Sequence, residues 1–179
     1  MAASSSLVPV EEYLSTNYRP NCDYIDGVLR QKPMATWKHG LLQSRLAQLV
    51  NQGFPQFVAG SEITVKIRAG KYLVPDLIVQ RRDRIQDPYP TDPVHLCIEI
   101  LSPEDMMSEA LAKCEECHAW GVETAWIVDP ESKRAWVYRS GQRPLEVPQA
   151  GSLTADGISI LLQDVLSVLS VRKKITVAL

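Results

Sequence analysis

The sequence has no long apolar run and no excess of positive charge, and both absences exclude classes of protein. No stretch of the 179 residues approaches the ~20 apolar residues that a membrane-spanning helix needs. Residues 1–10 hold no basic residue and no apolar run of signal-peptide length, so we expect a cytoplasmic protein with no membrane partner. The formal net charge is −2, whereas proteins that bind nucleic acid chiefly through phosphate contacts are usually basic. Tight non-specific binding is therefore not expected, but binding through a local patch and a metal ion stays open.

Cysteine is scarce, and in a reducing cytoplasm its four copies are expected as free thiols unless they bind a metal. Cys114, Cys117 and His118 match the haem-attachment pattern C-x-x-C-H, but they fall in the middle of a predicted helix and no export signal precedes them. A zinc site would need two further ligands, for which only Cys22, Cys97, His39 or His95 remain. Both alternatives are weaker than structural roles for these side chains.

Repeats, low-complexity segments and flexible linkers are absent, which predicts a single domain over residues 1–179 with its core at about 20–140. Helices are expected at 9–16, 36–52 and 103–120, and strands at 23–31, 57–67, 72–80, 95–101, 125–129 and 135–138. A proline-rich connection at 81–93, a late apolar segment at 158–169 and a basic tail from Arg172 complete the chain. This order indicates an α/β (α+β) fold, with a mixed sheet flanked by helices.

Two acids interrupt apolar runs that are predicted to be strands. Asp76 lies within Leu73–Val79, and Glu99 lies within Leu96–Leu101. A carboxylate in such surroundings is costly unless a positive group compensates it. Neighbouring strands could bring the two acids together, and a pair of carboxylates with open coordination positions suits Mg²⁺ or Mn²⁺. The alternative is that each acid lies at a strand end and faces solvent.

The helix that follows Glu99 carries a lysine on its apolar face. At ~100° per residue, Lys113 falls on the same face as Ala110 and Cys117, so it is predicted to point toward the sheet. An ammonium beside a metal-bound water could position that water for attack. The alternative is an ordinary surface ion pair between Glu109 and Lys113.

Three further polar residues have a functional and a structural interpretation. His39 lies on the apolar stripe of its helix, where it is either a core histidine or a proton carrier or phosphate contact. Glu62 precedes Ile63 and is either a third acid of the site or a solvent-facing residue. Asp23 and Asp26 flank a turn at Asp26-Gly27, which explains them without a function.

These pieces, in their order along the chain, resemble the PD-(D/E)XK nuclease superfamily, and within it the bacterial family of restriction-endonuclease-like proteins (Uma type). The segments that carry the resemblance are Asp23–Gly27, His39, Val74–Leu77, Ile98–Pro103, Glu109 with Lys113, Gly121-Val122 and Trp126–Pro130. The resemblance implies that Asp76 and Glu99 bind the metal. It also implies that Leu101 replaces the motif lysine, and that Lys113 from the following helix takes its place. The family usually has Asp where this chain has Glu109, and Tyr where it has Cys117.

The sequence thus predicts a Mg²⁺-dependent endonuclease that hydrolyses DNA. In this hypothesis Asp76 and Glu99 hold the metal, Lys113 orients the attacking water, and Glu62 or His39 assists. The departures at Leu101, Glu109 and Cys117 keep open a catalytically silent nuclease-fold module for binding or assembly. Hydrolysis of another phosphate ester at the same site is a third alternative. A homodimer is expected, because two-fold symmetry suits paired cleavage of a duplex.

Overall fold

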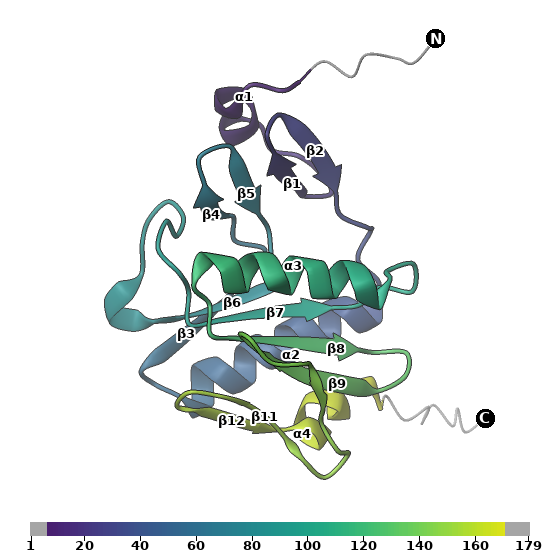
Figure 1. Cartoon of the computed structure of the whole chain (residues 1–179). Coiled ribbons are helices and arrows are strands. Elements are labelled where there is room, and N and C mark those ends of the chain that lie inside the picture. The colour runs from purple at the N-terminus through teal and green to yellow at the C-terminus, as the bar shows by residue number, and fades with distance from the viewer. Residues whose placement is uncertain (1–6, 171–179) are drawn as a thin grey trace, which may run out of the picture.

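A computed structural model describes residues 7–170 of the chain, arranged as a main sheet between helices with two smaller sheets packed beside it (Figure 1). The helices are α1 (Val10–Ser15), α2 (Trp37–Gly53), α3 (Met107–Trp120) and α4 (Leu162–Leu166), with short 3₁₀ turns at Arg82–Arg84 and Ser167–Leu169. The strands are β1 (Cys22–Ile25), β2 (Val28–Gln31), β3 (Phe57–Ser61), β4 (Val65–Arg68), β5 (Lys71–Leu73), β6 (Leu77–Arg81), β7 (Leu96–Ile100), β8 (Thr124–Asp129), β9 (Arg134–Arg139), β10 (Leu145–Glu146), β11 (Ser152–Ala155) and β12 (Ile158–Leu161).

The main sheet is mixed, as the sequence predicts. Its six strands run in the order β10-β9-β8-β7-β6-β3, and only β7 and β8 are parallel. The chain crosses from β7 to β8 through α3, since parallel neighbours need a long connection. Gly121, with a φ of +117°, ends α3 in a left-handed conformation that favours glycine, and the chain then enters β8.

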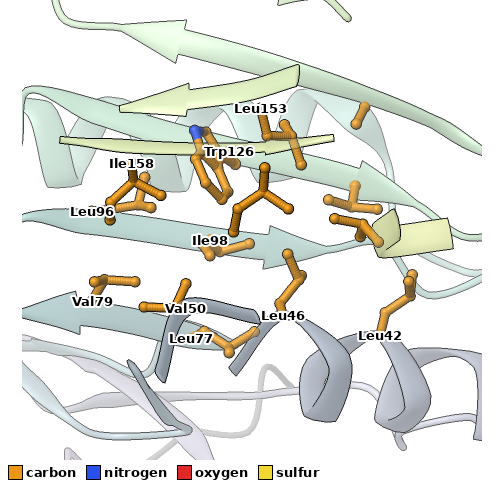
Figure 2. Close-up of a cluster of buried hydrophobic side chains, with 14 of the residues drawn as sticks. Leu42, Leu46, Val50, Leu77, Val79, Leu96, Ile98, Trp126, Leu153 and Ile158 are labelled. Carbon is orange, nitrogen blue, oxygen red and sulfur yellow. The ribbon is translucent and has the colours of Figure 1, made fainter. Parts of the chain in front are cut away.

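One face of the main sheet packs against α2 and forms the largest core (Figure 2). The predicted stripe on α2 supplies Leu42, Leu46 and Val50, each with no exposed surface. They face strand residues such as Ile98 and Trp126, and the C-terminal hairpin β11–β12 closes the far side of this cluster. Each such side chain contributes roughly 1.5–3 kcal/mol when it is fully buried, so this packing holds α2 firmly in place.

The opposite face of the main sheet packs against α3. Successive residues of a strand point to opposite faces, so Ile98 and Ile100 face α2 whereas Cys97 and Glu99 face α3. On α3, Cys114 and Cys117 are buried against this face. The alternation therefore places the single acid of β7 directly beneath the helix that carries Lys113.

Three predicted strands each divide into two, because the chain turns or changes sheet within them. The predicted strand at 23–31 is the hairpin β1–β2, with its turn at Asp26 and Gly27, both at positive φ. The predicted strand at 57–67 breaks at Glu62 (φ +52°) into β3 of the main sheet and β4 of a second sheet, whose order is β2-β1-β5-β4. The predicted strand at 72–80 breaks at Val74–Asp76 for the same reason. Asp76 thus lies in the connection that enters β6, which corrects its expected position inside a strand.

The other differences concern the ends of the fold. Helix α3 begins at Met107 and not at residue 103, because residues 103–106 form a turn in which Asp105 accepts a hydrogen bond from the Ser102 amide. The late apolar segment at 158–169 divides into β12, α4 and a 3₁₀ turn. The basic tail from Arg172 lies outside the described residues. Within residues 7–170, no helix is long and apolar enough to cross a membrane.

Candidate active site

A pocket of about 370 Å³ lies where the second sheet, the start of α2, the end of β7 and helix α3 meet. Asp76, Glu99, Lys113, His39 and Glu62 all line it, so the structure brings every residue that the sequence singled out to one place. Three of them are buried: Asp76, Glu99 and His39. The alternative in which the two acids face solvent at strand ends is therefore wrong.

Asp76 is held by donors from three elements. Its Oδ2 accepts a 2.7 Å hydrogen bond from the backbone amide of Ile100, and Nε2 of His39 lies 3.2 Å from the same atom. Its Oδ1 lies 2.5 Å from Nζ of Lys32. Its backbone carbonyl accepts a hydrogen bond from the side-chain amide of Gln43 on α2. The carboxylate therefore has a fixed orientation in a buried environment.

Glu99 is also buried, and one of its oxygens is unpartnered. Its Oε2 lies 3.4 Å from Nζ of Lys113, whereas Oε1 is buried and has no hydrogen-bond partner among residues 7–170. A buried carboxylate oxygen without a partner is costly and typically indicates an absent water or ion. Burial raises the pKa of Glu99 to about 7, an effect that Lys113 opposes and the charge of Asp76 reinforces.

Lys113 points from α3 into the pocket, which confirms its predicted direction. Besides Glu99, its Nζ contacts the carbonyl of Val74 at 2.8 Å and Oδ2 of Asp23 at 3.6 Å. No ion pair joins it to Glu109 in the part of the chain that the structure describes, so the surface-pair alternative is not observed. Burial alone would lower the pKa of Lys113, but the charges of Glu99 and Asp23 outweigh it and keep the ammonium protonated.

Two charged residues of the site were not singled out from the sequence. Lys32 follows β2 and contacts both Asp76 and, at 3.1 Å, the carbonyl of Val74. The sequence explained Asp23 by its position beside a turn. In the structure Asp23 accepts a hydrogen bond from the Val74 amide at 2.6 Å and faces Lys113. For Asp23 the resemblance offered a signal, because its segment is part of the series. Lys32 lies in no apolar run and in no segment of that series.

His39 is both a buried residue of α2 and a neighbour of the Asp76 carboxylate. It is buried on the stripe of α2, its Nε2 faces Asp76, and its Nδ1 has no partner. Burial raises the cost of the Asp76 charge, but the hydrogen bond from His39 and the ammonium of Lys32 outweigh it and hold the pKa of Asp76 well below its ordinary value. Asp76 is therefore ionised at neutral pH.

Glu62 lies at the rim of the pocket. Its side chain is exposed and accepts a 2.5 Å hydrogen bond from Asn21, and its backbone amide donates to the carbonyl of Asp76. It therefore shapes the connection that carries Asp76, while its carboxylate is available to solvent or to a bound molecule.

The donor set fits a hard divalent cation. Asp76 and Glu99 supply carboxylate oxygens, one of them buried and unpartnered. Within residues 7–170 no group of three or more His, Cys, Asp or Glu side chains is arranged to hold a metal. A pair of carboxylates matches Mg²⁺, which commonly binds one or two carboxylates and completes its shell with water and substrate phosphates.

The amino-acid sequence matches the Uma2 family, described as "Putative restriction endonuclease", over residues 10–172. The chain belongs to the Uma2 family. This membership supports a nuclease-like function, and it agrees with the resemblance that the motifs indicated. No protein of curated function matches the sequence.

One solved structure shows that this Uma2 chain has a restriction-endonuclease-like fold. A crystal structure from Anabaena variabilis ATCC 29413, described as "a putative nuclease belonging to DUF820", aligns with a TM-score of 0.78 and 24% identity over 90% of this chain and 99% of that one. A DrdV–DNA complex aligns with a TM-score of 0.37 and 14% identity over 61% of this chain and 12% of that one, which is too low to support an inference.

The remaining sequence features of this Uma2 protein have structural explanations. Cys114 and Cys117 are buried free thiols, and Nδ1 of His118 is 2.7 Å from the carbonyl of Val122. Burial raises the pKa of Cys114 far above its ordinary value, which does not favour a thiolate ligand. At the end of β6, Arg81 pairs with Asp83, and Arg82 donates a hydrogen bond to the carbonyl of Pro55. These two basic side chains therefore have partners close to them in the fold.

Proposed function

We propose that this protein is a metal-dependent endonuclease that hydrolyses phosphodiester bonds in DNA, with Mg²⁺ or Mn²⁺ held by Asp76 and Glu99. The observation that carries the proposal is the convergence of two buried carboxylates and a charged lysine in one pocket, with Oε1 of Glu99 unpartnered. This is the arrangement expected of the PD-(D/E)XK pattern, with Lys113 in the role of the motif lysine that Leu101 replaces.

Each side chain has a role that its contacts support. A metal ion on the two carboxylates would hold a phosphate oxygen and lower the pKa of an attacking water. Lys113, fixed by Glu99 and the Val74 carbonyl, orients that water toward phosphorus and offsets the charge that develops as the new O–P bond forms. The attacking water gives up a proton to solvent, the ester P–O bond on the opposite side breaks, and the leaving oxygen takes a proton from solvent.

His39 and Glu62 support the reaction in different ways. Because His39 contacts Asp76 from α2, it orients that carboxylate and offers a ring nitrogen near the reacting groups. Glu62 is exposed at the rim and can accept a proton from a solvent molecule that enters the pocket. In this proposal the metal is held by Asp76 and Glu99, and neither His39 nor Glu62 replaces them.

The test combines metal binding with cleavage. Isothermal titration of Mn²⁺ into the wild-type protein and into Asp76→Asn should show binding that the variant loses. Cleavage of supercoiled and linear DNA in Mg²⁺ should disappear in Asp76→Asn and in Glu99→Gln, both of which preserve side-chain shape. Unchanged cleavage in both variants would contradict the proposed site.

A second candidate function is a catalytically silent module that binds DNA or an assembly partner. The contact of Lys32 with Oδ1 of Asp76 favours it, because an ammonium neutralises the acid without a metal. Sustained metal-dependent cleavage by the purified protein would eliminate this candidate. The expected homodimer stays a prediction, and sedimentation equilibrium of the full chain would test it.

A further inference from the structure

We propose that Lys32 is an internal counter-ion that occupies the metal-binding oxygen of Asp76 and yields it when a divalent cation enters. The inference rests on the proposed function, because it concerns the same pair of carboxylates. In this proposal Lys32, which follows the β1–β2 hairpin, controls whether a metal ion binds at the site. Neither the family description nor the motif series contains this role.

The two oxygens of Asp76 are not equivalent, and only one can serve a cation. Oδ2 accepts the 2.7 Å hydrogen bond from the Ile100 amide and faces Nε2 of His39. Oδ1 is the oxygen left for coordination, and Nζ of Lys32 already lies 2.5 Å from it. A metal ion bound to Asp76 must therefore compete with this ammonium.

Glu99, the other acid of the pair, has an oxygen that no lysine contacts. Oε1 of Glu99 is buried and has no partner, so nothing in the described part of the chain competes for it. The pair thus offers a cation two oxygens: Oε1 of Glu99, which is open, and Oδ1 of Asp76, which Lys32 contacts. This asymmetry distinguishes Lys32 from Lys113, which contacts Glu99 through the other oxygen, Oε2, and leaves Oε1 free.

Lys32 can leave Oδ1 without losing all its partners in the pocket. Its Nζ also contacts the Val74 carbonyl at 3.1 Å, and its backbone amide is tied to the carbonyl of Asn21. A small rotation of the side chain could therefore move the ammonium off Asp76 while the hairpin stays in place.

Charge balance supports the same exchange. Three carboxylates (Asp23, Asp76 and Glu99, when ionised) face two ammonium groups (Lys32 and Lys113), which leaves one negative charge in the cluster. A divalent cation changes this to one positive charge, which matches the single negative charge of a phosphodiester. The displaced ammonium then lies on the side of the pocket where it can contact a phosphate oxygen.

The test is calorimetric titration of Mn²⁺, without DNA, into the wild-type protein and into Lys32→Met. Removal of a contacting positive charge should tighten Mn²⁺ binding at least about tenfold. The matched control is Lys71→Met, because Lys71 is also buried and lines the same pocket but pairs with Glu116. Loss of its more distant charge should tighten binding only about twofold, since solvent and salt screen it.

A crystal structure of the wild-type protein with Mn²⁺ gives a second, independent measurement. The expected result is an ion between Asp76 and Glu99, with Nζ of Lys32 moved beyond hydrogen-bond distance of Oδ1. An ion bound while Nζ keeps its contact with Oδ1 would overturn the inference. So would equal tightening in Lys32→Met and Lys71→Met, because that would indicate general electrostatics.

The outcomes separate this inference from the proposed function. If the wild-type protein and Lys32→Met bind Mn²⁺ equally and Asp76→Asn does not bind, the inference fails and the metal site stands. If neither the wild-type protein nor any of the variants binds Mn²⁺, both the inference and the proposed metal site fail. Circular dichroism and thermal unfolding of each variant show whether it is folded before the titrations are compared.

Discussion

The backbone amide of Ile100 donates a hydrogen bond to Oδ2 of Asp76, so the strand that carries Glu99 also orients the other acid of the pair. Asp76 comes from the connection that enters β6 and Glu99 comes from β7, but this contact makes their relative placement a property of the sheet. His39 and Lys32 contact the same carboxylate from α2 and from the β1–β2 hairpin. A site built this way is preorganised, because each donor is anchored by an element with its own packing.

Removal of the Asp76 carboxylate should destabilise the fold as well as the site. Asp76→Ala removes the carboxylate that pairs with the Lys32 ammonium and the acceptor of the Ile100 amide, both in a buried environment. We expect the free energy of unfolding to fall by about 3 kcal/mol, the range for a broken buried ion pair. Urea denaturation measures this change. The control Glu131→Ala removes an exposed partner of Lys38 and should leave the midpoint nearly unchanged.

Glu99 should make the protein less stable as the pH rises through neutrality. The pKa of Glu99 is about 7 in the folded state and 4.5 in its ordinary state, so the folded protein binds the extra proton between these values. The stability that this proton contributes is fully present below about pH 4.5 and is lost as the pH rises through about 7.

This pH dependence of stability appears as a difference between the wild-type protein and the Glu99→Gln variant. From pH 5 to pH 8, the wild-type protein should lose roughly 2–3 kcal/mol more of its unfolding free energy than Glu99→Gln, which cannot ionise. Urea unfolding at each pH, with metal ions removed by a chelator, measures this. Glu104→Gln, at an exposed position, should follow the wild-type curve. Parallel curves for the wild-type protein and Glu99→Gln would contradict the raised pKa.

Lys113 should matter far more to cleavage than to folding of the main sheet. Lys113→Met removes the ammonium beside Glu99 while it retains the apolar stem that packs from α3. Under saturating Mg²⁺ we expect kcat for DNA cleavage to fall by about a hundredfold, as when one transition-state donor is lost. Single-turnover kinetics measures the rate. The control Lys38→Met removes an exposed lysine that pairs with Glu131, and its rate should match that of the wild-type protein.

The packing of α2 should be essential to the site that it supports. Leu46 has no exposed surface and lies against the main sheet, between Leu42 and Val50 of the same helix (Figure 2). Leu46→Ala should cost about 2–5 kcal/mol of unfolding free energy because it leaves a cavity in the largest core. Thermal or urea unfolding checks this. Leu14→Ala, at a position that is 43% exposed, should cost under about 1 kcal/mol.

Local pattern was enough to place most helices and the central strands. The apolar stripe predicted for α2 follows the helical period: Leu42, Leu46 and Val50 are fully buried in the observed helix, and Leu49 is partly buried. The strands around Cys97 and Trp126 are largely apolar runs, interrupted in β7 by Glu99, and such runs are typical of strands covered on both faces. The same patterns predicted that Lys113 faces the sheet, because helical phase alone decides which side of α3 it occupies.

Local pattern failed where the chain passes from one sheet to another. The segments 57–67 and 72–80 read as single strands because apolar residues lie on both sides of each break, yet they break at Glu62 and at Val74–Asp76. A strand that changes sheet keeps its alternation on both sides of the break, so periodicity does not mark the bend. The burial of Asp76 beside its donors follows from this bend.

The sequence by itself determined the mixed α/β class, the two acids in apolar surroundings, the direction of Lys113 and, through its motif series, the family. Only the tertiary structure decided that Lys32 and Asp23 belong to the site, because Lys32 lies 44 residues from Asp76 along the chain and meets it through the β1–β2 hairpin. Periodicity reports which face of its own element a residue occupies. It holds no information on which distant element packs there, and in this protein that packing sets the charge balance around Asp76 and Glu99.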